Sequence, residues 1–304
     1  MQTADPSWQR RLRQAAAAFW LAKFFWICER IPRLALAARP LLCALAIVCS
    51  PSVRRNARSN ARYLLGSDAT RFQRMRLLFR TLSSFYLFCF DVARSCRDSP
   101  DEMRKRVRWI GGREIYRQAR AAHRGMIVVT AHMGSFEVAM AELRAVEENV
   151  HVLFHRDAVG LFERQRGELR RRLGLHEAAL DDGWTVWIKL REALLNDQVV
   201  VIQGDRVLPG QKGRCVPFMG GQMELPLAPI KLAIATGAPI VPIFSLRTPD
   251  GGIQLVVKEP VQISAGEDES LPLLHWAQVL EQQIATHAHQ WLMLVPAWHD
   301  RGDV

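Results

Sequence analysis

The chain lacks the cysteine and histidine spacings that build zinc sites or disulfide frameworks. None of its six cysteines forms a Cys-x-x-Cys pair, and no further ligand lies near His287 and His289 in the sequence. Most of the cysteines lie in apolar stretches, where a free thiol behaves as a small hydrophobic group. We therefore expect reduced cysteines, a cytoplasmic active face and no metal ion.

Signatures of nucleic-acid binding and of serine hydrolases are also missing. The formal net charge is +11, from 41 basic and 30 acidic residues, yet no zinc-finger or helix-turn-helix pattern accompanies it. The basic residues cluster beside apolar segments, which favours an anionic membrane surface or an acidic carrier protein over nucleic acid as a partner. The absence of a Gly-x-Ser-x-Gly elbow counts against a lipid hydrolase with a serine nucleophile.

Long apolar runs are missing as well. Two apolar stretches near the N-terminus, residues 15–28 and 34–48, fall short of the roughly 18 uninterrupted apolar residues expected of a membrane-spanning helix. The Arg39-Pro40 pair interrupts the second stretch. No small-residue cleavage site follows a compact apolar segment, so a secretory signal is not expected.

Aromatic and basic residues around these stretches are typical of helices that lie at a membrane interface. Tryptophans occupy positions 8, 20 and 26. A pair of ordinary core helices is the alternative. We predict a membrane-associating helical segment over residues 1–50 and a second domain over residues 51–304. That domain is expected to have a basic helical lead-in, residues 52–108, followed by an α/β core, residues 109–304.

Within the core, apolar runs alternate with helical patterns. The expected strands are Met126–Thr130, Val150–Phe154, Val199–Ile202, Pro239–Phe244 and Ile253–Val257. The expected helices are Phe136–Val146, Gly160–Leu173, Trp184–Leu195 and Pro229–Thr236. This alternation predicts an α/β fold with a mostly parallel central sheet flanked by helices. Ligands bind such sheets at the carboxyl ends of the strands.

A histidine follows the first of these strands, and a glutamate comes five positions later. In one continuous helix, His132 and Glu137 would lie about 140° apart around the axis, but a turn between them allows contact. Such a pair would be a general base and its orienting carboxylate. The spacing alone is weak support, because His176 and Asp181 repeat it without an apolar strand before them. We interpret His176 as a surface residue near a helix end, and a structural strand-end histidine is the alternative for His132.

Charged residues follow two later strands. Arg156 comes after the second strand, and Asp205 and Arg206 come after the third. We expect these side chains at the same edge of the sheet as His132, with local salt bridges as the alternative. The arginines suit phosphate or the phosphopantetheine of a donor. Asp205 would bind an acceptor hydroxyl or anchor Arg206.

The glycines and the serine beside the histidine have expected roles of their own. Backbone N–H groups around Gly134 would hold a developing oxyanion. Ser135 lies at a helix start, where capping is its expected role. Gly213 and the Gly220-Gly221 pair are expected to shape a loop over the site.

Four sequence blocks occur in order: residues 131–137, 152–157, 201–206 with 213–220, and 236–244. Together they resemble the bacterial lipid A biosynthesis (late) acyltransferase family, within the lysophospholipid acyltransferase superfamily that carries a His-x4-Asp/Glu motif. The resemblance extends from the arginine-rich residues 54–62 to residues 290–292. Ser135-Phe136 stands where lipid A enzymes usually carry Asn-Trp, and residues 203–206 differ from their usual Asp-Gln-Asp. These departures leave the acceptor open.

The resemblance implies a glycerolipid acyltransferase-like fold and the transfer of a fatty acyl chain to a hydroxyl. The donor would be a thioester of acyl carrier protein or coenzyme A, and no cofactor is expected. His132 would be the base, with Glu137 holding its tautomer, in a direct attack without an acyl-enzyme. The acceptor would be a lipid A precursor or a related glycolipid or lysolipid, at the cytoplasmic face of the bacterial inner membrane. The alternatives are another acceptor lipid and a non-catalytic membrane-binding homologue.

Overall fold

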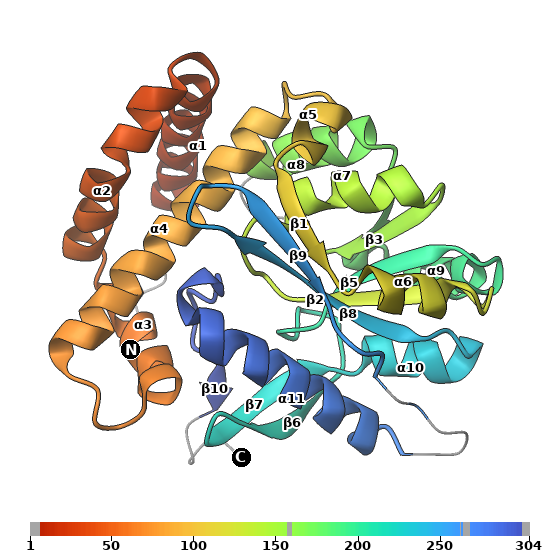
Figure 1. Cartoon of the computed structure of the whole chain (residues 1–304). Coiled ribbons are helices and arrows are strands. Elements are labelled where there is room, and N and C mark those ends of the chain that lie inside the picture. Colours follow the sequence, from red (N-terminus) through yellow and green to blue (C-terminus); the bar gives the residue numbers. More distant parts are fainter. Residues whose placement is uncertain (1–6, 157–159, 262, 264–267, 300–304) are drawn as a thin grey trace.

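The computed structural model describes residues 7–156, 160–261, 263 and 268–299. Helices α1 to α4 form a group beside an α/β core, with α4 running along the boundary between the two (Figure 1). Their bounds are α1 Ser7–Arg30, α2 Pro32–Cys49, α3 Pro51–Leu65 and α4 Arg71–Ser95. The helices of the core are α5 Pro100–Arg104, α6 Arg113–Arg120, α7 Phe136–Val146, α8 Gly160–Arg172, α9 Thr185–Leu195, α10 Ala228–Thr236 and α11 Ser270–His287.

The core is built on a seven-stranded sheet, which confirms the predicted fold class. Its strand order is β1-β9-β8-β2-β5-β3-β4, and only the β8–β9 pair is antiparallel. The bounds are β1 Val107–Gly111, β2 Met126–Thr130, β3 Val150–Phe154, β4 His176–Ala179, β5 Val199–Gln203, β8 Ile240–Arg247 and β9 Ile253–Val257. Strands β2, β3 and β9 have the predicted bounds, because buried strands of a parallel sheet are continuous apolar runs.

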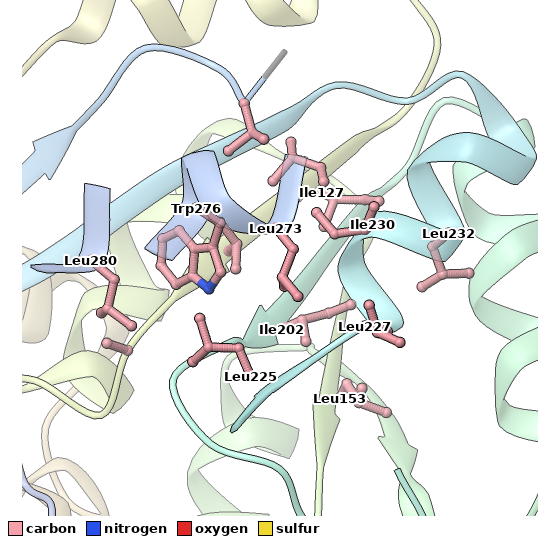
Figure 2. Close-up of a cluster of buried hydrophobic side chains, with 14 of the residues drawn as sticks. Ile127, Leu153, Ile202, Leu225, Leu227, Ile230, Leu232, Leu273, Trp276 and Leu280 are labelled. Atoms are coloured by element: carbon pink, nitrogen blue, oxygen red, sulfur yellow. The ribbon is translucent and has the colours of Figure 1, made fainter. Parts of the chain in front are cut away.

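Alternating side chains of the central strand pack into two cores. Ile127 and Val129 of β2 lie on the face covered by α9, α10 and α11, together with Trp276 of α11. Figure 2 shows this cluster, in which Ile127, Leu153 and Ile202 come from three neighbouring strands. Val128 faces the opposite core, which is covered by α7 and α8. Burial of both faces fixes the strand in the middle of the sheet and carries its carboxyl end to the edge where ligands bind.

Local structure differs from expectation at one strand and one loop. His176 is exposed and lies four residues after the end of α8, as expected, but it also begins an edge strand, β4, that pairs in parallel with β3 and was not predicted. The strand is short and only partly apolar, so main-chain pairing with β3 defines it and no sequence pattern does. The expected loop over residues 213–221 is a hairpin of β6, Gly213–Phe218, and β7, Gly221–Pro226.

The hairpin turn has the backbone that tight hairpins require. Met219 and Gly220 connect the strands, with φ of 47° and 77°. Two central residues with positive φ match the right-handed twist of the strands that they join. A short strand, β10 Trp298–His299, pairs with β7 and completes a second, three-stranded sheet.

The N-terminal helices also depart from expectation at one point. The second apolar stretch was expected to be too short to span a membrane, but helix α2 continues through Pro40 and has the length and composition to cross one, with a mean hydropathy of 1.6 over 18 residues. Only 11% of this window is buried, unlike a core helix. Trp20 and Trp26 of α1 are exposed, whereas the side chain of Trp8 lies outside the described residues. Contact with a membrane stays a prediction that these exposed surfaces support.

Candidate active site

His132 lies in a tight turn directly after β2, at the carboxyl edge of the sheet. The carbonyl of His132 accepts a hydrogen bond from the N–H of Leu292 at 2.8 Å, and the N–H of Gly134 donates to the carbonyl of Gln290 at 3.2 Å. Gly134 has a φ of 57°, and a Cβ at this position would lie 2.4 Å from the carbonyl oxygen of Ser245. The turn therefore requires glycine, and the 290–292 segment fixes its position.

Asp205 is the carboxylate that orients the histidine. Its Oδ1 lies 2.7 Å from Nδ1 of His132, and its Oδ2 accepts the backbone N–H of the same residue at 3.1 Å. Oδ2 also accepts Nε1–H of Trp291 at 2.8 Å. The carboxylate is fully buried. Three donors and no solvent therefore hold Asp205 in one orientation, with Nδ1 as the protonated nitrogen of a neutral imidazole.

The electrostatics of the pair favour a neutral base beside an ionised acid. Burial lowers the pKa of His132, and the positive charge of Arg206 lowers it further against the opposing effect of Asp205. Burial alone would raise the pKa of Asp205, but the charge and hydrogen bond of His132, with the charge of Arg206, hold it well below its usual range. At neutral pH, His132 therefore has an unprotonated nitrogen and Asp205 is a carboxylate.

The second ring nitrogen has an unexpected partner. Nη2 of Arg206 lies 2.9 Å from Nε2 of His132. An arginine in a protein is always charged and can only donate hydrogen bonds. Nε2 is therefore the acceptor, in agreement with a proton on Nδ1.

The expected contact between His132 and Glu137 is corrected by the structure. The carboxylate of Glu137 pairs with Arg166, whose Nε lies 2.5 Å from Oε1. Glu137 belongs to the first turn of α7 and its side chain reaches toward α8, whereas Asp205 approaches the ring from the neighbouring strand end. Arg166 nonetheless acts on His132 through its charge.

Strand register explains why Asp205 takes this place. Thr130 of β2 is paired with Gln203 of β5, and His132 and Asp205 each lie two residues beyond that pair. The sequence identified both residues as candidates but assigned Asp205 to the acceptor or to Arg206. The missing signal was that β2 and β5 are neighbours, which no local pattern shows.

Ser135 and Gly134 have structural roles that differ from those expected. The Ser135 hydroxyl does not cap α7 but donates to Asp91 of α4, which also pairs with Arg106 and Arg247. A hydrogen bond to this buried carboxylate, which also pairs with two arginines, is stronger than the bond that a helix cap would give to the hydroxyl. The N–H of Gly134 is engaged by Gln290, so it does not face a substrate.

Arg156 is not brought to His132. It pairs with Asp181 at 3.4 Å and with Asp182 at 2.8 Å, and its side chain is half exposed. Strand β5 separates β3 from β2, so the end of β3 faces the end of β4, where these aspartates lie. The local salt bridge, the alternative raised from the sequence, is the observed arrangement. Asp157, the last residue of its block, lies outside the described residues.

An apolar cavity of about 600 Å³ lies between α6, α7 and the sheet. Its walls include Val128, Ala139 and Met140, and it extends to Thr130 and Phe136 on either side of the turn that carries His132. The Phe136 ring packs edge-on against His132, with centroids 5.6 Å apart. The cavity therefore adjoins His132. Among the described residues, no group of three His, Cys, Asp or Glu side chains could hold a metal ion.

The chain has relatives among known acyltransferases. The chain is 28% identical over 193 residues to the phosphatidylinositol mannoside acyltransferase of Mycobacterium tuberculosis H37Rv, covering 63% of this chain and 60% of that protein. It is 28% identical over 178 residues to the enzyme of that name from Mycolicibacterium smegmatis, covering 58% of each. The match to the bacterial lipid A biosynthesis acyltransferase family extends over residues 5–300. The chain belongs to the bacterial lipid A biosynthesis acyltransferase family.

Proposed function

We propose that the protein is an O-acyltransferase that moves a fatty acyl chain from a thioester to a hydroxyl of a lipid A precursor or related glycolipid. The observation that carries this proposal is the buried His132–Asp205 pair at the carboxyl edge of the sheet. A hydroxyl is a weak nucleophile, so a base has to remove its proton as the new bond forms. A neutral imidazole with a fixed tautomer suits that task.

The proposed reaction is a direct attack. Nε2 of His132 takes the hydroxyl proton while the oxygen bonds to the thioester carbon. Asp205 stabilises the resulting imidazolium. The carbon–sulfur bond then breaks, and the imidazolium proton passes to the departing thiolate. Helix α7 begins at Phe136, so its N-terminal N–H groups and dipole lie beside the reacting carbon and stabilise the oxyanion.

The cavity supports an acyl donor. Its volume is in the range of sites that enclose small ligands, and its walls are predominantly apolar. Phe136 both lines this cavity and contacts the His132 ring, so an acyl chain seated there has its carbonyl next to the base. The donor is the thioester of acyl carrier protein or coenzyme A, and the basic surface suits either anionic partner.

Glu137 and Gly134 act on this reaction as positioning residues. Glu137 holds Arg166 near the imidazole, and Gly134 allows the turn that presents His132. The acceptor is inferred from the family and from the named activity of the mycobacterial relatives, which is acylation of a mannoside glycolipid. Such a lipid would be reached at the cytoplasmic face of the inner membrane, where the exposed faces of α1 and α2 contact the bilayer.

Two histidines with the same downstream spacing provide a matched test. His132→Ala is expected to abolish thiol release and acyl transfer from palmitoyl-coenzyme A to a glycolipid acceptor. His176→Ala removes an exposed histidine whose ring bonds to Asn149, and it should leave turnover unchanged. Circular dichroism and vesicle binding would show that both variants fold. Wild-type turnover in the His132 variant would exclude the assignment, and lipids of a deletion strain would identify the acceptor by loss of one acyl chain.

A further inference from the structure

The base of this site is occupied by a positive charge in the resting structure. Nη2 of Arg206 donates to Nε2 of His132, the nitrogen that has to accept the hydroxyl proton. The other ring nitrogen is engaged by Asp205. Both nitrogens of His132 therefore have partners, and a substrate hydroxyl has no free lone pair to approach.

Arg206 interacts with the charge of Asp205 but does not form a direct ion pair with it in the described residues. Within the described residues, no acidic side chain forms a salt bridge with it, and its Nε is buried without a hydrogen-bond partner. Asp205 is nearby, but both of its oxygens are occupied by His132 and Trp291. A guanidinium that is half-buried and only partly satisfied has a strong tendency to bind an anion.

The contact between Arg206 and His132 cannot persist through the reaction. When Nε2 takes a proton, the imidazolium carries N–H on both nitrogens. The N–H of Arg206 would then point at another donor, and two positive charges would lie in contact. Arg206 has to leave Nε2 before proton transfer begins.

We propose that Arg206 is a gate that blocks His132 until a substrate phosphate draws the guanidinium away. This inference rests on the proposed acyltransferase function and concerns the regulation of that site. In the blocked state, water cannot be deprotonated, so a bound thioester is protected from hydrolysis. Hydrolysis would follow the same course as transfer: water bonds to the thioester carbon, the carbon–sulfur bond breaks, and fatty acid and free thiol are released.

Two substrates can supply the phosphate. Coenzyme A and the phosphopantetheine arm carry phosphates on the donor, and a lipid headgroup carries one on the acceptor. In both cases a bidentate phosphate contact replaces the single bond to Nε2. Release by the acceptor would be the more protective arrangement, because the base would be freed only when the hydroxyl is present.

The first experiment needs no substrate. In the full-length protein with 13C-labelled histidine, the His132 resonance is assigned by its loss in His132→Ala and titrated by NMR. Asp205, Arg206 and Arg166 are the charged groups that act on this ring. Arg206→Gln is expected to raise the pKa of His132, because the neighbouring positive charge that lowers it is removed. Arg171→Gln removes an exposed arginine paired with Glu168 and should leave the titration unchanged.

The second experiment measures thiol release without an acceptor alcohol. With S-palmitoyl-N-acetylcysteamine, a thioester that lacks phosphate, Arg206→Gln should hydrolyse roughly tenfold faster than wild type, since a hydrogen bond to a charged group no longer has to be broken. Acyl transfer by the variant should fall, because the phosphate contact is lost. A purely structural role would lower both rates, so the opposite signs identify a gate.

A third experiment adds the donor phosphate and the headgroup phosphate separately, and it identifies which of them displaces Arg206 from His132. Wild type should hydrolyse palmitoyl-coenzyme A faster than the phosphate-free thioester if the donor opens it. It should instead respond to phosphatidic acid vesicles, but not to phosphatidylcholine vesicles, if a headgroup does. The gate is refuted if the titration of His132 is the same in wild type and Arg206→Gln, or if neither phosphate accelerates wild type. Because the titration needs no activity, it tests the gate even if no acyl transfer is found.

Discussion

The partner of His132 can be tested by replacing Asp205 with asparagine. Three donors converge on this carboxylate: Nδ1–H and the backbone N–H of His132, and Nε1–H of Trp291. Two of them meet at Oδ2 and one meets at Oδ1. An asparagine has a single acceptor oxygen, so its amide nitrogen has to face either two donors or one.

The preferred orientation of the asparagine predicts the defect. An unsatisfied buried donor costs about 1–3 kcal/mol, so the amide oxygen will take the Oδ2 position, where it satisfies two donors. The NH₂ group then faces Nδ1 of His132, which can accept only if its proton moves to Nε2. The base nitrogen is thereby protonated. In serine proteases, the equivalent change of tautomer lowers kcat by ~10⁴-fold, and we expect a loss of ~10³–10⁴-fold here.

The assay should separate chemistry from binding and from folding. Thiol release at saturating palmitoyl-coenzyme A and glycolipid gives kcat, and the KM for the donor should change little because the Asp205 carboxylate faces His132. Asp181→Asn is the control, since that carboxylate pairs with Arg156 and His155, away from His132. A kcat within about twofold of wild type in Asp205→Asn, a change of less than 0.5 kcal/mol in the barrier, would refute the reasoning.

The remaining predictions concern Glu137, the pH profile and the cavity. Glu137→Gln is expected to reduce kcat far less than Asp205→Asn, because it acts through Arg166; the reverse order would restore the pairing expected from the sequence. The acidic limb of the kcat/KM profile should lie below the usual histidine range, because burial lowers the pKa of His132 and activity is lost only as pH falls through that lowered value. Ala139→Phe fills the cavity wall and should shift donor preference to shorter chains, by roughly tenfold for every two carbons excluded, whereas the exposed Ala145→Phe on the same helix should not; unchanged chain-length preference in the first variant would remove the acyl chain from this cavity.

The parts of the fold that could be predicted are those in which burial acts on a local pattern. Residues 126–130 are apolar throughout because β2 is covered on both faces, and the sequence shows the strand directly. Residues 176–179 form a strand only because β3 offers them hydrogen bonds, so their own composition indicates nothing.

In the candidate site, too, the sequence identified residues but not the contact between them. His132 and Asp205 could be chosen from the sequence, since each is a polar residue placed just after an apolar strand. Their contact could not, because it joins positions 73 residues apart and depends on β5 lying next to β2. The local motif therefore predicted Glu137 as the partner of His132. The observed partner is Asp205, because the order of strands places β5 next to β2.

The position of α4 adds a physical link between the two parts of the chain. Phe25 and Cys28 of α1 pack on this helix near Phe90, and the next residue of α4 is Asp91. That carboxylate is buried and receives the Ser135 hydroxyl, three residues after the base. Helix α1 and the turn that carries Ser135 thus contact adjacent residues of α4, Phe90 and Asp91. Because a buried carboxylate that loses its partners is costly, the turn is held in place only while α4 keeps its position against the core.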